Sequence, residues 1–75
     1  MIITKSATGK GEKYTVSDDR FVLVAYHYPW HTRYFIKHTD ETRMRQEKAQ
    51  TLWNICPAMF RELRAEIGLR RYFRT

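Results

Sequence analysis

The strongest strand signal in the chain is RFVLVAYHY, from Arg20 to Tyr28, a run dense in β-branched and aromatic residues. Side chains alternate between the two faces of a strand. Both faces of this segment are apolar, with Phe21, Leu23 and Ala25 on one and Val22, Val24 and Tyr26 on the other. We therefore expect this strand at the centre of a sheet, with both faces covered or with one face reserved for a partner.

Shorter strands are predicted on both sides of this segment. Residues 13–16 precede it, and the intervening Ser17-Asp18-Asp19 suits a turn because Asp side chains bond nearby backbone amides. On the other side, Pro29-Trp30 is expected to reverse the chain before residues 32–38 return as a third strand. Ile2-Ile3 is a candidate for a fourth strand.

Two helices are predicted after the strands. Residues 39–53 contain no glycine or proline, and Glu41 and Arg45 have the i,i+4 spacing of a helical ion pair. Pro57 is expected to break this helix and to open a second one, which should stop near Gly68. The sequence thus predicts an α+β fold, a three-stranded or four-stranded antiparallel meander followed by two helices broken at Pro57.

The length of 75 residues predicts a single small domain over residues 1–75, of marginal stability. Within it, residues 6–13 predict a flexible loop and residues 69–75 a basic C-terminal tail. Cys56 is the only cysteine, which excludes a disulfide within the chain and favours a cytoplasmic location. No apolar run approaches the ~20 residues of a membrane span, and a homodimer is the expected source of additional stability.

Positive charge is concentrated in the second half of the chain. Residues 1–42 hold six Lys or Arg against five Asp or Glu, whereas residues 43–75 hold eight against three, which gives the net charge of +6. Guanidinium groups match the geometry of phosphates, and such a lopsided field favours a polyanion as partner. The cations predicted to contact nucleic acid are Arg43, Arg45, Lys48, Arg61, Arg64, Arg70, Arg71 and Arg74.

A second candidate surface is the aromatic and apolar part of the predicted sheet. Aromatic side chains on an open sheet can stack on unpaired bases. They can also form the centre of a protein interface, where Tyr and Trp are enriched, or belong to the core. The residues predicted for stacking or for a protein interface are Val22, Val24, Tyr26, Trp30, Tyr34 and Tyr72.

No motif in the chain indicates a reaction, a metal or a cofactor. His27 and His31 have H-x₃-H spacing without a cysteine pair, whereas structural zinc sites use paired, closely spaced ligands. The segment Thr8-Gly9-Lys10-Gly11 has neither the spacing nor the context of a phosphate-binding P-loop. The chain is therefore expected not to be an enzyme and to hold neither metal nor cofactor.

Three functions remain open at this point. The leading hypothesis is a regulatory or accessory module that binds DNA or RNA through an arginine-rich C-terminal helical region. The alternative is a phage- or mobile-element-type inhibitor or adaptor that docks on an acidic host protein through its sheet face and basic helix. The third is a small ribonuclease or toxin that uses His27 or His31. The element order over residues 13–54 resembles that of the small arm-binding domains of some phage recombinases, a resemblance in element order alone.

Overall fold

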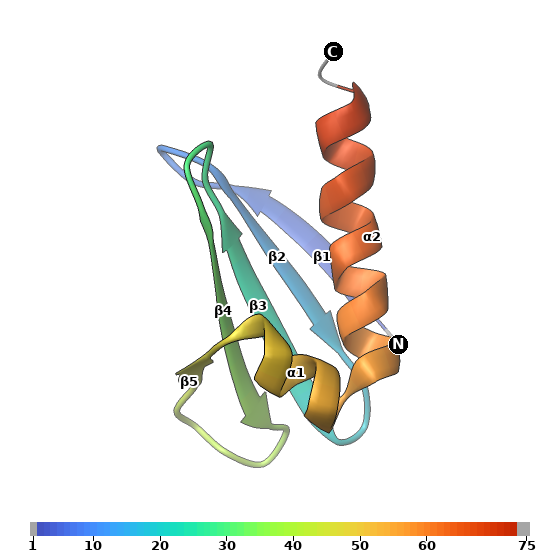
Figure 1. Ribbon diagram of the computed structural model, residues 1–75. Coiled ribbons are helices and arrows are strands. Elements are labelled where there is room, and N and C mark those ends of the chain that lie inside the picture. Colours follow the sequence, from blue (N-terminus) through green and yellow to red (C-terminus); the bar gives the residue numbers. More distant parts are fainter. Residues whose placement is uncertain (1, 74–75) are drawn as a thin grey trace.

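The computed structural model describes the backbone of residues 2–73, and their side chains except those of Ala7 and residues 69–73. Five strands form one antiparallel sheet in the order β1-β2-β3-β4-β5, and two helices follow them (Figure 1). The predicted α+β meander is confirmed, and the sheet is larger than expected. The elements are β1 (Ile2–Ala7), β2 (Glu12–Ser17), β3 (Phe21–His27), β4 (Thr32–His38), β5 (Arg45–Glu47), α1 (Ala49–Ile55) and α2 (Pro57–Phe73).

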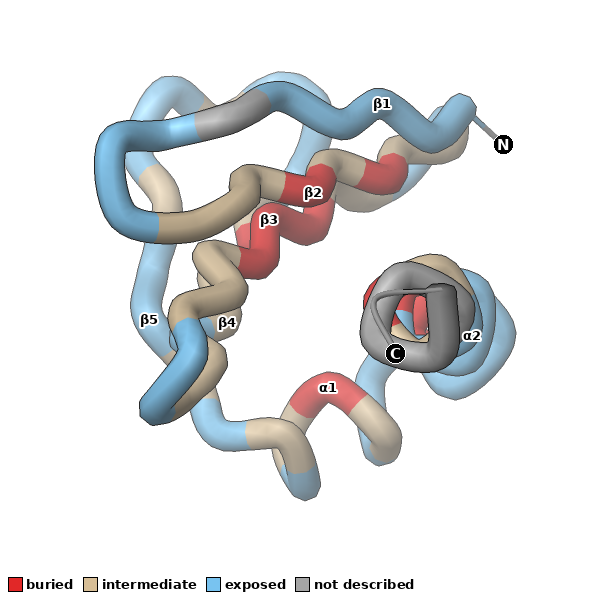
Figure 2. The backbone as a smooth tube through the Cα atoms, turned by 90° about the horizontal axis from the view of Figure 1, so that it is seen from above, coloured by how far each residue is buried: buried red, intermediate tan, exposed pale blue. Residues whose placement is uncertain are grey.

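Both helices lie on the same side of the sheet, and α2 packs against β2 and β3 (Figure 2). The hydrophobic core fills the space between the two layers. Phe60, Leu63 and Ile67 recur at helical spacing, so they share the side of α2 that faces the sheet. The buried cluster consists of Tyr14, Val16, Leu23, Ala25 and Ile36 from the strands and Leu52, Cys56, Met59, Phe60, Leu63 and Ile67 from the helical segment.

The central strand β3 is apolar on both faces, as its sequence predicts. Leu23 is in register with Ile36 of β4, and both are fully buried under the helices. Val24 points the other way, in register with Thr15 of β2 and Phe35 of β4, where no described helix covers the sheet (Figure 2). The two apolar faces of β3 therefore have different surroundings: one is covered by the helices, and on the other Val24 is buried among neighbouring side chains of the sheet.

The connections between the first four strands are short. The loop predicted over residues 6–13 is confined to residues 8–11, because β1 and β2 both extend into the predicted range. Pro29-Trp30 lies at the β3–β4 turn, as predicted. The β2–β3 turn is built around Asp18, also as predicted.

We expect the stability of the fold to depend on the charge of Asp18. Its carboxylate accepts the N–H groups of Phe21 and Arg20, each at 2.8 Å, and these bonds lower the pKa of the carboxyl group. A lowered folded-state pKa stabilises the fold above the unfolded value of about 3.9, and this contribution is lost as the pH falls through the folded value. Asp18→Ala should therefore lower the melting temperature at pH 7, and the difference from wild type should shrink toward pH 3, as measured by circular dichroism.

The control is Asp19→Ala, which removes the neighbouring exposed carboxylate and should change the melting temperature little at either pH. An equal loss at pH 7 and pH 3 for Asp18→Ala would contradict a contribution from the charged form.

Residues 39–48 do not form the predicted helix. They begin with a turn in which Glu41 donates its N–H to the His38 carbonyl at 3.0 Å and accepts the His38 N–H on its carboxylate at 2.7 Å. The Lys37 ammonium donates to the Glu41 carbonyl at 2.8 Å. The chain then pairs with β4 as β5 before α1 begins. The Glu41–Arg45 ion pair forms at 3.4 Å, in a loop that leads into a strand.

The helix break at Pro57 is confirmed, since α2 begins at that residue. The predicted stop at Gly68 is wrong, because the helical backbone continues to Phe73. Part of the segment predicted as a tail is therefore helical, and residues 74–75 lie outside the described residues.

Candidate functional site

The sheet face opposite the helices is uncovered in the described part of the chain, and we call it the open face (Figure 2). Because side chains alternate along a strand, the neighbours of the core residues Tyr14, Leu23 and Ile36 belong to this face. On the three central strands its residues stand in three cross-strand rows: Lys13–Tyr26–Arg33, Thr15–Val24–Phe35 and Ser17–Val22–Lys37.

These rows include three cations and no carboxylate. The strand acids Glu12 and Glu47 alternate with the residues of the open face and therefore belong to the opposite face of the sheet. Their register partners, His27 and Tyr34, also lie outside the three rows. Arg33 is exposed, whereas Lys13 and Lys37 are half-buried. With no acid among them to neutralise these charges, the open face carries a positive potential.

An aromatic pair lies between the cations of the open face. Tyr26 and Phe35 meet edge to face, with ring centroids 5.6 Å apart and planes at 89°. The Lys13 ammonium lies 5.8 Å from the Tyr26 centroid, in the range of a cation–π interaction. Val24 is only 4% exposed. The centre of the open face is therefore closely packed, apolar and aromatic, with cations around it.

Two of the cations are held in place by polar contacts. The Lys37 ammonium donates to three backbone carbonyls, those of Glu41 at 2.8 Å, His38 at 3.4 Å and Thr39 at 3.5 Å, so its charge is fixed at one end of the face. At the other end, the Nε–H of Arg33 donates to Nε2 of His31 at 3.0 Å. This bond uses one of the five guanidinium N–H donors, and the others can contact a ligand.

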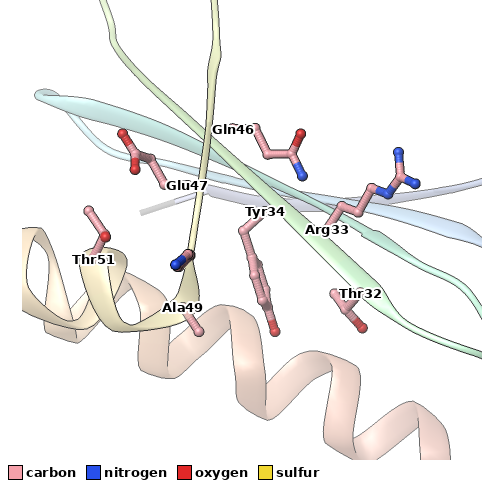
Figure 3. A pocket seen from close by; sticks show the side chains of 8 residues that line it. Thr32, Arg33, Tyr34, Gln46, Glu47, Ala49 and Thr51 are labelled. Carbon is pink, nitrogen blue, oxygen red and sulfur yellow. The ribbon is translucent and has the colours of Figure 1, made fainter.

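An open hollow of about 860 Å³ lies beside Arg33, along the edge of β4, and is lined by residues of β4, β5 and α1 and by Lys48 between the last two. Figure 3 shows that Arg33 and Gln46 point to one side of the sheet, whereas Tyr34 points to the other, toward the helices, where Ala49 of α1 also lines the hollow. The lining thus belongs to both sheet faces. The hollow is an open notch at the sheet edge, which leaves space around the Arg33 side chain.

The cations predicted between the sheet and α1 do not join the open face rows. Arg43 and Lys48 are exposed in the segments on either side of β5. Arg45 forms ion pairs with Glu41 at 3.4 Å and with Glu47 at 3.9 Å, so much of its charge is neutralised.

Arg61 and Arg64 are exposed on α2, which lies on the opposite side of the sheet from the open face. The Arg64 guanidinium lies 5.8 Å from the Phe60 ring centroid. Burial raises the pKa of the Tyr34 phenol, and the neighbouring Arg64 guanidinium opposes that rise. Arg64 therefore covers the edge of the core.

Four predicted residues near the C-terminus lie outside the described region in whole or in part. The side chains of Arg70, Arg71 and Tyr72 are not described, and Arg74 lies beyond the described backbone.

The predicted apolar and aromatic residues divide between three places. Val22, Val24 and Tyr26 lie on the open face, as the alternation in the sequence predicts. Trp30 lies at the β3–β4 turn and is 63% exposed. Tyr34 lies on the helix-covered face and packs against the core.

The sequence interpretation placed Phe35 in the aromatic cluster but did not assign the cations Lys13, Arg33 and Lys37 to the same surface. The signal was present in residues 32–38, where Arg33, Phe35 and Lys37 alternate with residues that face the core at a period of two.

The described residues provide no metal site, because no three His, Cys, Asp or Glu side chains among them are grouped to hold an ion. Burial raises the pKa of the Cys56 thiol, which makes it a poor nucleophile at neutral pH. Nδ1 of His27 lies 2.8 Å from the Thr32 hydroxyl. His31 accepts the Arg33 donor, so the two histidines considered for catalysis make separate contacts.

Comparison of the sequence with known protein families, curated proteins and solved structures gave no match. No helix in residues 2–73 is long and apolar enough to cross a membrane.

Proposed function

We propose that this chain binds nucleic acid and that the open face is its principal contact surface. The observation that supports this proposal is the composition of that face, in which three cations without a carboxylate surround the Tyr26–Phe35 pair. Lysine and arginine contact phosphate oxygens, which position a protein on its ligand. Aromatic rings on an open sheet offer flat surfaces to bases.

The same face suits an acidic protein less well. Lysine is depleted in protein interfaces, whereas two of the three cations here are Lys13 and Lys37. The hydroxyl groups of Thr15 and Ser17 stand in the same cross-strand rows, and such groups commonly donate to phosphates. Arg61 and the predicted C-terminal arginines extend the positive field beyond the open face.

The test compares two double variants that remove the same charge. Lys13→Gln/Arg33→Gln changes the open face, and Lys5→Gln/Arg20→Gln removes one lysine and one arginine from outside its rows. Fluorescence anisotropy with labelled single-stranded DNA, duplex DNA and RNA, across a series of salt concentrations, gives affinity and salt dependence. The open-face variant should weaken binding and reduce the slope of log K against log salt by about 1.4 for a single strand, because each phosphate contact contributes about 0.7.

The control variant should retain the wild-type slope. Equal loss in both variants would assign the effect to net charge and contradict the open face as the contact. Absence of salt-dependent binding to all three ligands would overturn the proposal and leave an acidic protein as the ligand class. Alanine substitution of Arg70, Arg71 and Arg74 tests separately whether the C-terminal cations add phosphate contacts.

A further inference from the structure

The β3–β4 hairpin ends in an aromatic tip. The N–H of Tyr28 donates to the His31 carbonyl at 2.8 Å and closes the turn around Pro29-Trp30. The rings of Tyr28 and Trp30 are stacked, with centroids 5.3 Å apart and planes only 9° from parallel. The His31 ring lies at an angle to both, with its centroid 5.3 Å from Tyr28 and 5.7 Å from Trp30.

The exposure of Trp30 at this tip is unusual for so large an apolar side chain. Its residue surface is 63% exposed, so the Tyr28 stack orders the indole without burying it. A ring that is already oriented loses less conformational entropy when a flat ligand adds to it. The indole therefore provides a preformed surface for one further planar group.

The tip is continuous with the open face. His31 accepts the hydrogen bond of Arg33, which belongs to the first cross-strand row with Tyr26. A ligand whose phosphates reach Arg33 would place its next nucleotides beside the Tyr28–Trp30 stack.

Resting on the function proposed above, we infer that the Tyr28–Trp30 stack is a base-stacking site and that the preferred ligand is single-stranded nucleic acid. In a duplex the faces of the bases are covered by their neighbours, whereas an unpaired base can add its face to the exposed indole. Base–aromatic stacking of this kind tolerates any sequence because every base has a flat π surface. The site therefore distinguishes unpaired from paired strands without reading sequence.

The experiment separates base stacking from phosphate binding. Labelled oligothymidylate of ten nucleotides is compared with an abasic strand that has the same length and the same phosphates. The wild-type protein should bind oligothymidylate about 10-fold more tightly than the abasic strand, within the range measured for one stacked base. Trp30→Ala should remove most of this preference and leave the affinity for the abasic strand unchanged, whereas Trp30→Phe should retain part of it.

Two further measurements distinguish a loss of stacking from a loss of structure: the melting temperature tests folding, and indole fluorescence tests contact with a base. The melting temperature of Trp30→Ala should match the wild type, since the side chain is largely exposed. In a Trp53→Phe background Trp30 is the only indole, and its emission should be quenched by oligothymidylate and not by the abasic strand.

The comparison of the two strands tests the stacking site and the phosphate contacts of the open face separately. Lys13→Gln/Arg33→Gln should weaken binding to both strands alike. Salt-dependent wild-type binding that is equal for the two strands would overturn the stacking site and any base contact by Tyr26 and Phe35, and leave the phosphate contacts of the open-face cations. A preference for oligothymidylate that Trp30→Ala retains in full would also overturn the stacking site and would assign that preference to Tyr26 and Phe35. Binding to neither strand would overturn both.

Discussion

Phe60→Ala should destabilise the fold by about 3–5 kcal/mol, the range for removing a buried phenylalanine. Phe60 is fully buried, and its ring contacts the rings of two other aromatic residues. Its ring packs edge to face on Tyr34, with centroids 5.0 Å apart, and on Trp53 at 4.9 Å. Removing it leaves a cavity between α1, α2 and the sheet, and takes away two aromatic contacts in addition to buried area.

The expected loss is large relative to the total free energy of unfolding of the protein. A chain of 75 residues has an unfolding free energy of about 4–11 kcal/mol at the usual value per residue, so the substitution should remove a large share of the stability and, at the low end of this range, most of it. Urea unfolding followed by circular dichroism measures the change. Ile55→Ala on α1 is the control, because Ile55 is 42% exposed and should cost much less. A similar loss in both variants would contradict Phe60 as the centre of the core.

Gly11→Ala should destabilise the fold by about 1–3 kcal/mol, as expected when an added methyl group forces neighbours apart. A Cβ at this position would overlap the His27 carbonyl oxygen and lie 2.8 Å from a ring carbon of Tyr28. Gly11 does not have a positive φ, so the requirement is steric. Because Tyr28 supports the Trp30 stack, the variant should also reduce the preference for oligothymidylate over an abasic strand.

Gly9→Ala is the matched control in the same loop, since a Cβ there meets nothing within 4 Å. Thermal unfolding and the two-strand binding comparison should both distinguish the variants. If Gly11→Ala behaved like Gly9→Ala, the close approach of Tyr28 to the β1–β2 loop would not be required for stability or for binding.

The strands before residue 39 were the most predictable part of the fold. The apolar run in β3 and the Asp18 turn are local signals, and the structure preserves them because the local preference and the sheet register agree. The Pro57 break was equally local, because proline restricts the backbone wherever it occurs.

The segment before α1 could not be predicted in the same way. Residues 39–48 have helix-forming composition, but the β4 edge offers hydrogen-bond partners to residues 45–47. Composition does not reveal pairing with a neighbouring strand, which overrides a helix propensity of this size. Continuation of α2 past Gly68 also shows that one glycine lowers helix stability without ending the helix.

The candidate site was predicted in part. The apolar members of the open face follow from alternation in β3, but its cations come from β2 and β4. Counting charges along the sequence pointed to the C-terminal half, because such a count emphasises cations that are close together in the sequence. Cross-strand register instead gathers isolated cations, such as Lys13 and Arg33, into one surface.

The meander has a consequence for synthesis of the chain. Every strand pairs with its neighbour in sequence, so each hairpin can close over a short loop soon after it leaves the ribosome, with a small entropic penalty. The helix that covers β2 and β3 is made after all five of the described strands. Until α2 docks, the nascent sheet exposes Leu23 and Ile36 as well as the open face, and is vulnerable to association with other chains. Docking of α2, which is translated after the strands, thus ends the period in which the core side of the sheet is exposed.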